Sequence, residues 1–236
     1  MLKRILSVTF IAALAGFAHA EQNVSPGINS YYTNPDVGSW VSVFERDGRE
    51  IFDRRHDILS AMQVQPGMSV ADVGAGTGFF SLMLARAVGP QGKVYAVDIS
   101  PDFLAAIAKR AETEGLDNVV TVLSDQKDVK LPHGKLDRIY IGDTYHHFEY
   151  PVTYSRTIAA ALKPKGQVIV VDFKRIPGFS SAWVLGHVRA GKETFIHEMS
   201  QAGLTLLEDL DFMQTQYFLR LGLAGVSEHP SPAPSQ

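Results

Sequence analysis

The sequence predicts an α/β protein whose core is a doubly wound, mostly parallel sheet with helices on both faces. Three observations lead to this prediction. Short apolar runs alternate along the chain with longer segments of helical periodicity. The first such run, Ser69 to Val73, passes through a glycine-rich turn straight into an Ala-rich helical segment. Acidic residues follow successive predicted strands, and ligands of such sheets bind outside the carboxyl ends of the strands.

The glycine-rich turn holds Gly74, Gly76 and Gly78 at alternate positions, just before a helix over 79–88. Glycine accepts positive φ and lets a ligand come close to the backbone, and the first turn of the helix offers free N–H groups at the same place. The dinucleotide fingerprint G-x-G-x-x-G would require glycine at position 79, where this chain has Phe79. The turn therefore predicts a bound ligand with a different glycine spacing.

Composition limits the class of protein. With 236 residues and 45% hydrophobic content, the chain can bury the core of one ordinary domain. The formal net charge of −3 offers no basic surface for nucleic acid, so we expect no such partner. The chain has no cysteine, which excludes thiol nucleophiles, disulfides and Cys-ligated metals. The sequence gives no indication of oligomeric state.

Residues 1–20 are typical of a secretory signal peptide. Lys3 and Arg4 precede an apolar run over 5–17, and Ala18-His19-Ala20 is a small-x-small cleavage site. The apolar run is shorter than the roughly 20 residues that span a bilayer. We therefore expect cleavage after Ala20 and an exported, periplasmic protein with no stable membrane anchor.

The segments after the signal peptide differ in character. Residues 21–36 are predicted to form an extended arm, and 37–62 one or two amphipathic cap helices before the core. The aromatic residues here either pack onto the sheet or close over a ligand as a lid, and the lid candidates are Tyr31, Tyr32 and Trp40. The main domain is expected over 37–223, followed by a disordered tail over 224–236.

Within the domain, the periodicity assigns most of the remaining chain to strands and helices. The predicted strands are 69–73, 93–98, 119–123, 136–142 and 167–173, with a closing antiparallel pair at 204–210 and 217–223. The predicted helices are 79–88, 101–114, 154–162 and 192–202. A turn is expected at 163–166 and a loose segment at 177–191.

Acidic residues follow three of the predicted strands, and for two of them the sequence allows two roles. Asp98 can accept hydrogen bonds from the ribose hydroxyls of a nucleoside, or it can cap the next helix, although Ser100 before Pro101 is the better-placed cap. Asp125 follows the third strand and can contact a ligand or simply form a turn. Asp143 follows the fourth strand, which with the first flanks the point where strand order reverses.

With Asp72 followed by G-x-G-x-G, and with these acids at the strand ends, the chain resembles the class I S-adenosylmethionine-dependent methyltransferases over roughly 37–223. The resemblance implies a Rossmann-like sheet of seven strands with the last antiparallel, and S-adenosylmethionine as cofactor. It also implies an adenine contact for Asp125. The implied cofactor-binding residues are Asp72, Gly74, Ala75, Gly76, Thr77, Gly78, Asp98, Ile99, Asp125, Gln126 and Asp143.

The fourth strand lacks the Asn/Asp-Pro-Pro-Tyr/Phe signature of amino methylases, so the chain looks more like the small-molecule branch, which includes quinone and sterol methylases. The missing cysteines argue against the arsenite-methylating branch. The candidate catalytic residues are Asp143, His146 and His147, because a histidine titrates near neutral pH and suits proton transfer. The candidate substrate residues are Tyr31, Tyr32, Trp40, Tyr145, His187 and Arg189.

Asp143 could bind a metal together with His146 or His147, or together with Asp172, but no recognisable ligand spacing supports this, so no metal is predicted. Two other functions stay open. One is a binding protein for S-adenosylmethionine or a related nucleoside that has lost catalysis. The other is a nicotinamide-dependent oxidoreductase, which Phe79 disfavours.

Overall fold

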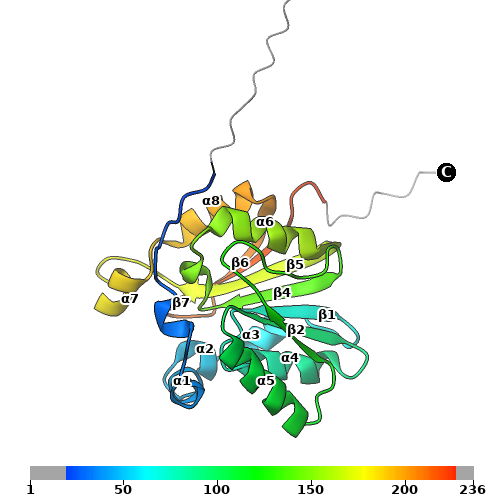
Figure 1. Ribbon diagram of the computed structural model, residues 1–236. Coiled ribbons are helices and arrows are strands. Elements are labelled where there is room, and N and C mark those ends of the chain that lie inside the picture. Colours follow the sequence, from blue (N-terminus) through cyan, green and yellow to red (C-terminus); the bar gives the residue numbers. More distant parts are fainter. Residues whose placement is uncertain (1–19, 227–236) are drawn as a thin grey trace, which may run out of the picture.

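The computed structural model describes residues 20–226, which form a seven-stranded mixed sheet with helices on both faces (Figure 1). The strand order is β3-β2-β1-β4-β5-β7-β6, and β7 runs antiparallel to both of its neighbours. This confirms the predicted fold class. The strands are β1 (Ser69–Val73), β2 (Lys93–Asp98), β3 (Val119–Leu123), β4 (Leu136–Gly142), β5 (Leu162–Phe173), β6 (Leu204–Leu210) and β7 (Gln216–Leu223). The predicted signal peptide up to residue 19 and the tail over 227–236 lie outside the described residues.

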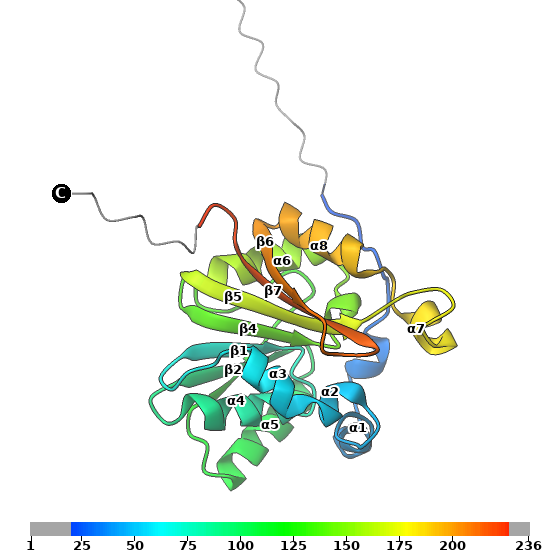
Figure 2. The same cartoon turned by 180° about the vertical axis from the view of Figure 1, so that it is seen from behind.

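The helices divide between the two faces of the sheet, as Figures 1 and 2 show from opposite sides. One face carries α3 (Arg55–Ala61), α4 (Phe79–Val88) and α5 (Pro101–Thr113), and the other carries α6 (Pro151–Ala161) and α8 (Lys192–Gln201). A hydrophobic core lies on each face of the sheet. Alternate residues of each strand contribute to the two cores, since successive side chains of a strand point to opposite faces. Tyr140, for example, packs on Phe80 of α4, while its neighbours Ile139 and Ile141 join the core under α6 and α8.

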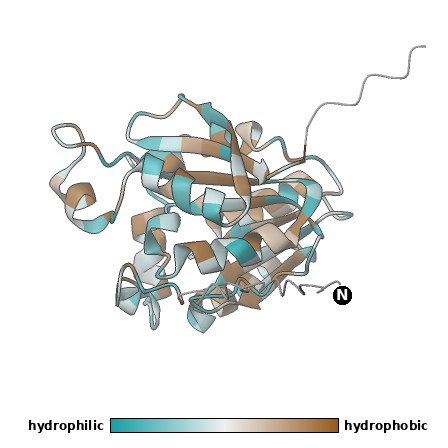
Figure 3. Ribbon diagram, turned by 90° about the horizontal axis from the view of Figure 1, so that it is seen from above, coloured by the Kyte–Doolittle hydropathy of each residue, from teal (hydrophilic) through white to brown (hydrophobic). Residues whose placement is uncertain are grey.

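The central strands are apolar on both faces, and they are mainly brown in the hydropathy view of Figure 3. In β5, all residues from 166 to 172 are buried. Continuous burial of this kind is expected where helices cover both sides of a parallel sheet. Among residues 20–226, no helix has the length and apolar character needed to cross a membrane.

The segment before β1 forms a cap at the carboxyl edge of the sheet. The cap contains a 3₁₀ turn at Ser30–Tyr32 and the helices α1 (Val37–Phe44) and α2 (Glu50–Asp53), and α3 follows them on the face of the sheet. The prediction of one or two helices over 37–62 was wrong in number. The chain leaves α1 at Glu45 and turns through Gly48, which has a φ of 84°, and a second break at Arg54 separates α2 from α3. Before the 3₁₀ turn, the arm runs past α6, where the Glu21 carboxylate accepts hydrogen bonds from two backbone amides of the first helical turn, at 2.9 and 2.6 Å.

Two segments differ from the sequence prediction. The expected turn at 163–166 is part of β5, which begins at Leu162 and pairs with Leu136 of β4. Gly166 serves this close approach, since a Cβ there would lie 2.5 Å from the Leu136 carbonyl oxygen. The expected loose segment at 177–191 contains a short helix, α7 (Ala182–His187), whose first turn is capped by the Ser181 side chain.

Candidate functional site

A cavity of about 1020 Å³ lies at the carboxyl ends of the strands, under the N-terminal cap. Ligand pockets in proteins are typically about 300–1,000 Å³, so this one has room for a nucleoside-sized molecule and a second small molecule. The structure brings most of the predicted site residues to its wall. Those that line it are Tyr31, Tyr32, Trp40, Asp72, Gly74, Ala75, Gly76, Thr77, Asp98, Ile99, Asp125, Gln126, Asp143, His146, His147 and His187.

The glycine turn between β1 and α4 brings bare backbone to the cavity. Gly74 has a φ of 73°, and a Cβ there would lie 2.2 Å from a side-chain carbon of Thr144. Gly76 has a φ of 53°, and a Cβ there would lie 3.2 Å from a ring carbon of Phe44 on α1. Both positions therefore require glycine for the backbone angle and for the close approach of a neighbour. The turn is also held to the cap through Arg110, which donates to the Thr77 carbonyl at 2.8 Å and pairs with Glu45 at 2.6 Å.

Asp72 is buried at the end of β1 and accepts a hydrogen bond from the Ser81 hydroxyl of α4 at 2.7 Å. Burial raises the pKa of Asp72 to about 7, because the charged form loses its hydration, while the bond from Ser81 opposes that rise and the nearby charge of Asp98 adds to it. The carboxyl group is thus half ionised near neutral pH and borders the ligand cavity.

Asp98 ends β2 and organises the adjacent backbone. Its carboxylate accepts hydrogen bonds from the Gly76 and Ser100 amides, each at 2.9 Å. Burial raises the pKa of this carboxyl, and the two amides oppose the rise. The cap of α5 is Ser100, whose hydroxyl accepts from the Phe103 amide with Pro101 in the first turn, as predicted. Asp98 is therefore free of the helix-capping role and lines the cavity.

Asp125 lies at the rim of the cavity and forms the turn that was its alternative role. One carboxylate oxygen accepts from the amides of Lys127 and Asp128 at 2.8 and 2.9 Å, and the other pairs with Lys130 at 3.0 Å. Gln126 beside it receives a hydrogen bond from Asn29 of the arm, at 3.3 Å. The ligand contact predicted for Asp125 stays a prediction.

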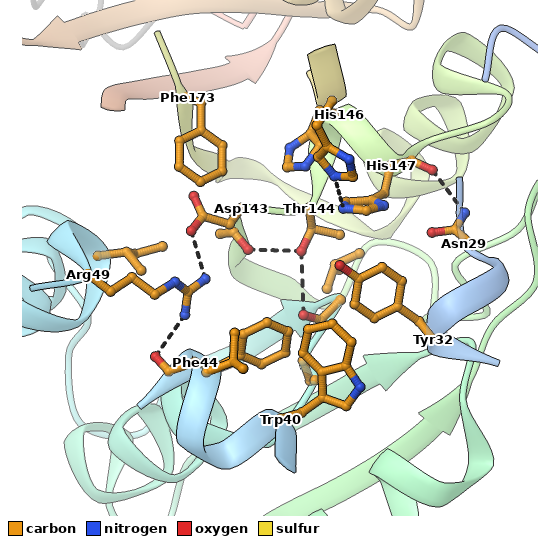
Figure 4. Close-up of a pocket in the computed structure, with 18 of the residues that line it drawn as sticks. Asn29, Tyr32, Trp40, Phe44, Arg49, Asp143, Thr144, His146, His147 and Phe173 are labelled. Carbon is orange, nitrogen blue, oxygen red and sulfur yellow. Dashed lines mark hydrogen bonds and ion pairs between the residues drawn. The ribbon is translucent and has the colours of Figure 1, made fainter. Parts of the chain in front are cut away.

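Asp143 joins the sheet edge to the cap. It has a positive φ of 48°, and its carboxylate binds Arg49 at 2.7 Å (Figure 4). The carboxylate also accepts a hydrogen bond from the side chain of Gln216. Burial raises the pKa of Asp143 to about 6, although the positive charge of Arg49 opposes the rise. Arg49 in turn donates to the Phe44 carbonyl at 2.8 Å. The carboxylate therefore sets the position of the cap over the cavity.

Three histidines meet deeper in the cavity. The His146 ring donates or accepts through Nδ1 at 2.7 Å from Asp172 of β5, and its backbone amide donates to the same carboxylate at 3.1 Å. His147 Nε2 lies 3.4 Å from His187 Nε2 on α7. Burial lowers the pKa of His147 to about 2, and its two histidine neighbours lower it further. The ring of Trp183 stacks on His187 with 4.6 Å between the ring centroids.

A row of aromatic side chains closes the cavity from the side of the cap. Tyr32 lies against Trp40, and Trp40 against Phe44, each with 4.9 Å between ring centroids. Tyr32 also meets the edge of His147 at 5.1 Å, as Figure 4 shows. The row thus lies beside both the glycine turn and the histidines. Its closing over a ligand as a lid stays a prediction.

Three predicted site residues do not line the cavity. Tyr145 is buried in the core under α8, where its hydroxyl bonds Glu198 at 3.1 Å, and Arg189 forms a paired ion bridge with the same Glu198. Gly78 faces α5, since a Cβ there would lie 2.6 Å from Ile107. Gly78 was predicted from the glycine spacing, Tyr145 from its place after β4 and Arg189 from its place after β5. In the structure, all three pack against or brace other parts of the domain.

Several lining or bracing residues were not found from the sequence. Arg49 and Phe44 lie in the cap, Phe173 at the end of β5, and Gln216 in β7. Asp172 was considered only as a metal ligand, and its partnership with His146 follows from the adjacency of β4 and β5. Strand-end position was the available signal for Asp172 and Phe173; no local pattern marks Arg49 or Gln216.

Comparisons with known proteins agree with this geometry. A family model described as a methyltransferase domain matches residues 64–214. Among curated relatives, the demethylmenaquinone methyltransferase of Geobacillus stearothermophilus is 29% identical over 134 residues, covering 55% of this chain and 57% of the relative. That of Listeria welshimeri is 28% identical over 131 residues, covering 55% of this chain and 56% of the relative. The chain thus spans little more than half the length of these relatives.

Solved structures share the fold at low sequence identity. A SAM-dependent methyltransferase from Aquifex aeolicus matches with a TM-score of 0.70 and 23% identity, covering 80% of this chain and 98% of that one. The [4+2]-cyclase SpnF matches with a TM-score of 0.68 and 19% identity, covering 87% and 98%. An N-methyltransferase from Haemonchus contortus, in complex with phosphomonomethylethanolamine and S-adenosylhomocysteine, matches with a TM-score of 0.62 and 19% identity, covering 78% and 45%.

Proposed function

This chain belongs to the class I S-adenosylmethionine-dependent methyltransferase family, and we propose that it transfers a methyl group from S-adenosylmethionine to a small-molecule acceptor. The observation that carries the proposal is that a single cavity joins the glycine turn and Asp98 to the group formed by Asp143, His146 and His147. Family membership argues against the nicotinamide-dependent alternative.

The residues at the glycine turn fit S-adenosylmethionine, the cofactor of this family. The turn offers bare backbone at the cavity wall, where Gly74 and Gly76 adopt positive φ and lie close to Thr144 and Phe44. Asp98 uses part of its acceptor capacity on two backbone amides, and a carboxylate has about four acceptor sites, so it can still accept from ribose hydroxyls. Asp72 adds a buried carboxyl group near the same turn, where a cationic ligand favours its ionised form.

When bound, S-adenosylmethionine supplies a methyl group made electrophilic by its sulfonium. The chain's own contribution is then to position the acceptor and keep water away. The aromatic row of Tyr32, Trp40 and Phe44 covers the cavity on one side, and Phe173 and Trp183 line it on another. Walls of this kind favour an acceptor with a planar or apolar ring, which sits well against aromatic faces.

Asp143 is the side chain that we assign to proton removal from the acceptor. Its pKa of about 6 leaves it mostly ionised at pH 7 to 8 yet basic enough to accept a proton. Arg49 and Gln216 hold the carboxylate in place at the cavity wall. The catalytic roles predicted for His146 and His147 stay predictions.

The export of the protein is part of the proposal and depends on the sequence of residues 1–20. Cleavage after Ala20 would leave Glu21 as the first residue, and Glu21 already binds the domain at the start of α6. Amino-terminal sequencing of the protein from its native host tests this. Intact residues 1–20 on a protein that stays in the cytoplasm would overturn it.

The proposed activity is tested with the purified chain, S-adenosylmethionine carrying a labelled methyl group, and fractionated small-molecule extracts. We expect labelled product from at least one fraction, and at least tenfold less from Asp98→Ala protein assayed at a donor concentration limiting for the wild type. S-Adenosylhomocysteine binding without any labelled product would favour the non-catalytic binding protein. Absence of S-adenosylhomocysteine binding would refute the donor site itself.

A further inference from the structure

Three histidine side chains converge at the far end of the cavity from the glycine turn. One ring nitrogen from each of His146, His147 and His187 lies within 4.8 Å of the other two. His146 and His147 follow β4, and His187 ends α7 after β5, so the group forms only in the folded chain. We propose that these three histidines bind a single divalent transition-metal ion of the zinc type.

The ring of His146 is held as a metal ligand usually is. Its Nδ1 lies 2.7 Å from Asp172, which leaves Nε2 for another partner. Nε2 is buried and has no hydrogen-bond partner among residues 20–226. A buried polar atom without a partner is destabilising, and metal coordination would satisfy it. A carboxylate that binds the opposite nitrogen of a ligating histidine is the common supporting arrangement in metal sites.

The spacing of the other two rings also fits an ion. His147 Nε2 and His187 Nε2 are 3.4 Å apart. Two nitrogens that each lie about 2.0–2.1 Å from a tetrahedral zinc are separated by about 3.3–3.4 Å. The remaining separations are no more than 4.8 Å, so the His146 ring and the other two must approach further to share one ion. Trp183 already stacks on His187 and fixes the plane of its ring.

The ligand chemistry selects the kind of ion. Three imidazoles with no carboxylate among them suit zinc, copper, nickel or iron, whereas magnesium and calcium prefer oxygen ligands. No more than three histidines meet here among the described residues, so the ion keeps an open position, as in catalytic rather than structural zinc sites. All three histidines line the cavity, so that position faces it.

If the proposed methyl transfer holds, the open position takes an oxygen of the acceptor. This step depends on the proposed function, whereas metal binding itself does not. A hydroxyl bound to the ion would lose its proton more readily, because the positive charge stabilises the anion. The acceptor class this favours is a phenol or a hydroxylated ring.

The test uses the full protein without a histidine tag, stripped of metal with a chelator, in the absence of donor and acceptor. Cobalt(II) is titrated in, followed by its visible spectrum, and zinc is then added in competition. We expect one equivalent of cobalt with the intense bands of tetrahedral coordination, and its displacement by zinc. His187→Ala and His147→Gln are each expected to weaken binding at least tenfold.

Two further variants sharpen the result. His133→Ala removes an exposed histidine from the loop before β4 and should leave binding unchanged. Asp172→Asn keeps all three ligands and should weaken binding about 10–100-fold, as the loss of a supporting carboxylate does elsewhere. Unfolding of each variant without metal is measured, so that a folding defect is recognised.

The proposal is overturned if cobalt gives no tetrahedral spectrum, or if His187→Ala and His133→Ala bind zinc with the same affinity as the wild type. The two proposals fail separately. Methyl transfer that persists after chelation, in a protein that binds no metal, overturns the metal site alone. Metal binding with no methyl transfer to any fraction leaves the site in place and overturns the proposed activity.

Discussion

Arg49 lies 2.7 Å from Asp143, and this ion pair ties the loop between α1 and α2 to the carboxyl end of β4. The pair is asymmetric, because Asp143 is almost completely buried while the Arg49 side chain is one quarter exposed. The buried Asp143 carboxylate therefore loses more when the pair is broken than the Arg49 guanidinium does, because water can still hydrate the guanidinium. This contact helps to hold the cap over the cavity, and it opposes the rise in the pKa of Asp143 that burial causes.

We expect Arg49→Met to destabilise the protein by on the order of 2–3 kcal/mol at pH 8, because it leaves a buried carboxylate without its partner. The loss should be smaller at pH 5. Asp143 already has a pKa raised to about 6, and without Arg49 that pKa rises further, so at pH 5 the group is protonated in both proteins. Urea unfolding at the two pH values measures this.

The control for this prediction is Arg86→Ala, which breaks the more exposed pair with Glu114. Exposed pairs contribute about 0–1 kcal/mol, so little change is expected at either pH. Equal losses for Arg49→Met at pH 5 and pH 8 would contradict the role given to Asp143.

Asp72→Asn tests the buried carboxyl group beside the glycine turn. Since the folded-state pKa of Asp72 is raised to about 7, the folded protein binds this proton more tightly than the unfolded chain, and stability falls as pH rises from about 4 to about 7. Asparagine keeps an oxygen for the Ser81 hydroxyl and does not ionise. We expect a flatter pH profile and a gain on the order of 2–4 kcal/mol at pH 8 for the ligand-free protein, at about 1.36 kcal/mol per unit.

The same variant should bind S-adenosylmethionine more weakly, since the ionised Asp72 lies close to a cationic ligand. Urea unfolding from pH 4 to 8 and calorimetric titration with the donor give the two readings. An unchanged slope of stability with pH would show that Asp72 does not titrate in this range.

Asp98→Ala is expected to affect folding as well as donor binding. The Asp98 carboxylate accepts hydrogen bonds from the Gly76 and Ser100 amides, which would lose their partner. We expect a loss of stability of about 1–3 kcal/mol and of S-adenosylhomocysteine affinity of at least tenfold. Thermal unfolding and calorimetry on one preparation measure both.

The matched comparison is Gly76→Ala. Its Cβ would lie 3.2 Å from the Phe44 ring, and the φ of 53° strains any residue other than glycine. This variant should also weaken S-adenosylhomocysteine binding, since the strained turn and the displaced Phe44 ring both line the cavity. Wild-type affinity in both variants would refute the donor site.

The sequence predicted the elements whose signals are local. Strands β1 to β4 and helix α4 have the expected bounds, because apolar runs there end at glycine, proline or acidic residues. The start of β5 was wrong because Lys163-Pro164-Lys165-Gly166 reads as a turn, whereas pairing of Leu162 with Leu136 on the neighbouring strand extends the strand through it. Helix α7 was missed because it is short, although Ser181 caps it.

The same distinction explains the site. The glycine turn and the strand-end acids are found from spacing along the chain, and the structure gathers them at one cavity. The histidine group depends on His187, which lies 40 positions from His147 on another element. Asp172, the hydrogen-bond partner of His146, is a buried strand residue that cannot be told from any other acid at a strand end. Contacts between distant segments of this kind leave no periodic signal.

The two tryptophans allow the two ends of the cavity to be followed separately. Trp40 belongs to the aromatic row over the glycine turn, and Trp183 stacks on His187 at the histidine end. The chain has no other tryptophan. In Trp183→Phe protein, we expect S-adenosylhomocysteine to change the emission of Trp40 in a saturable way, because the ligand excludes water from beside the indole ring.

In Trp40→Phe protein, the same ligand should change the emission of Trp183 little, since that ring lies at the other end. Fluorescence titration of both variants, with calorimetry to confirm that each still binds the ligand, measures the difference. A larger response from Trp183 than from Trp40 would place the donor at the histidine end and reverse the assignment of the two ends of the cavity.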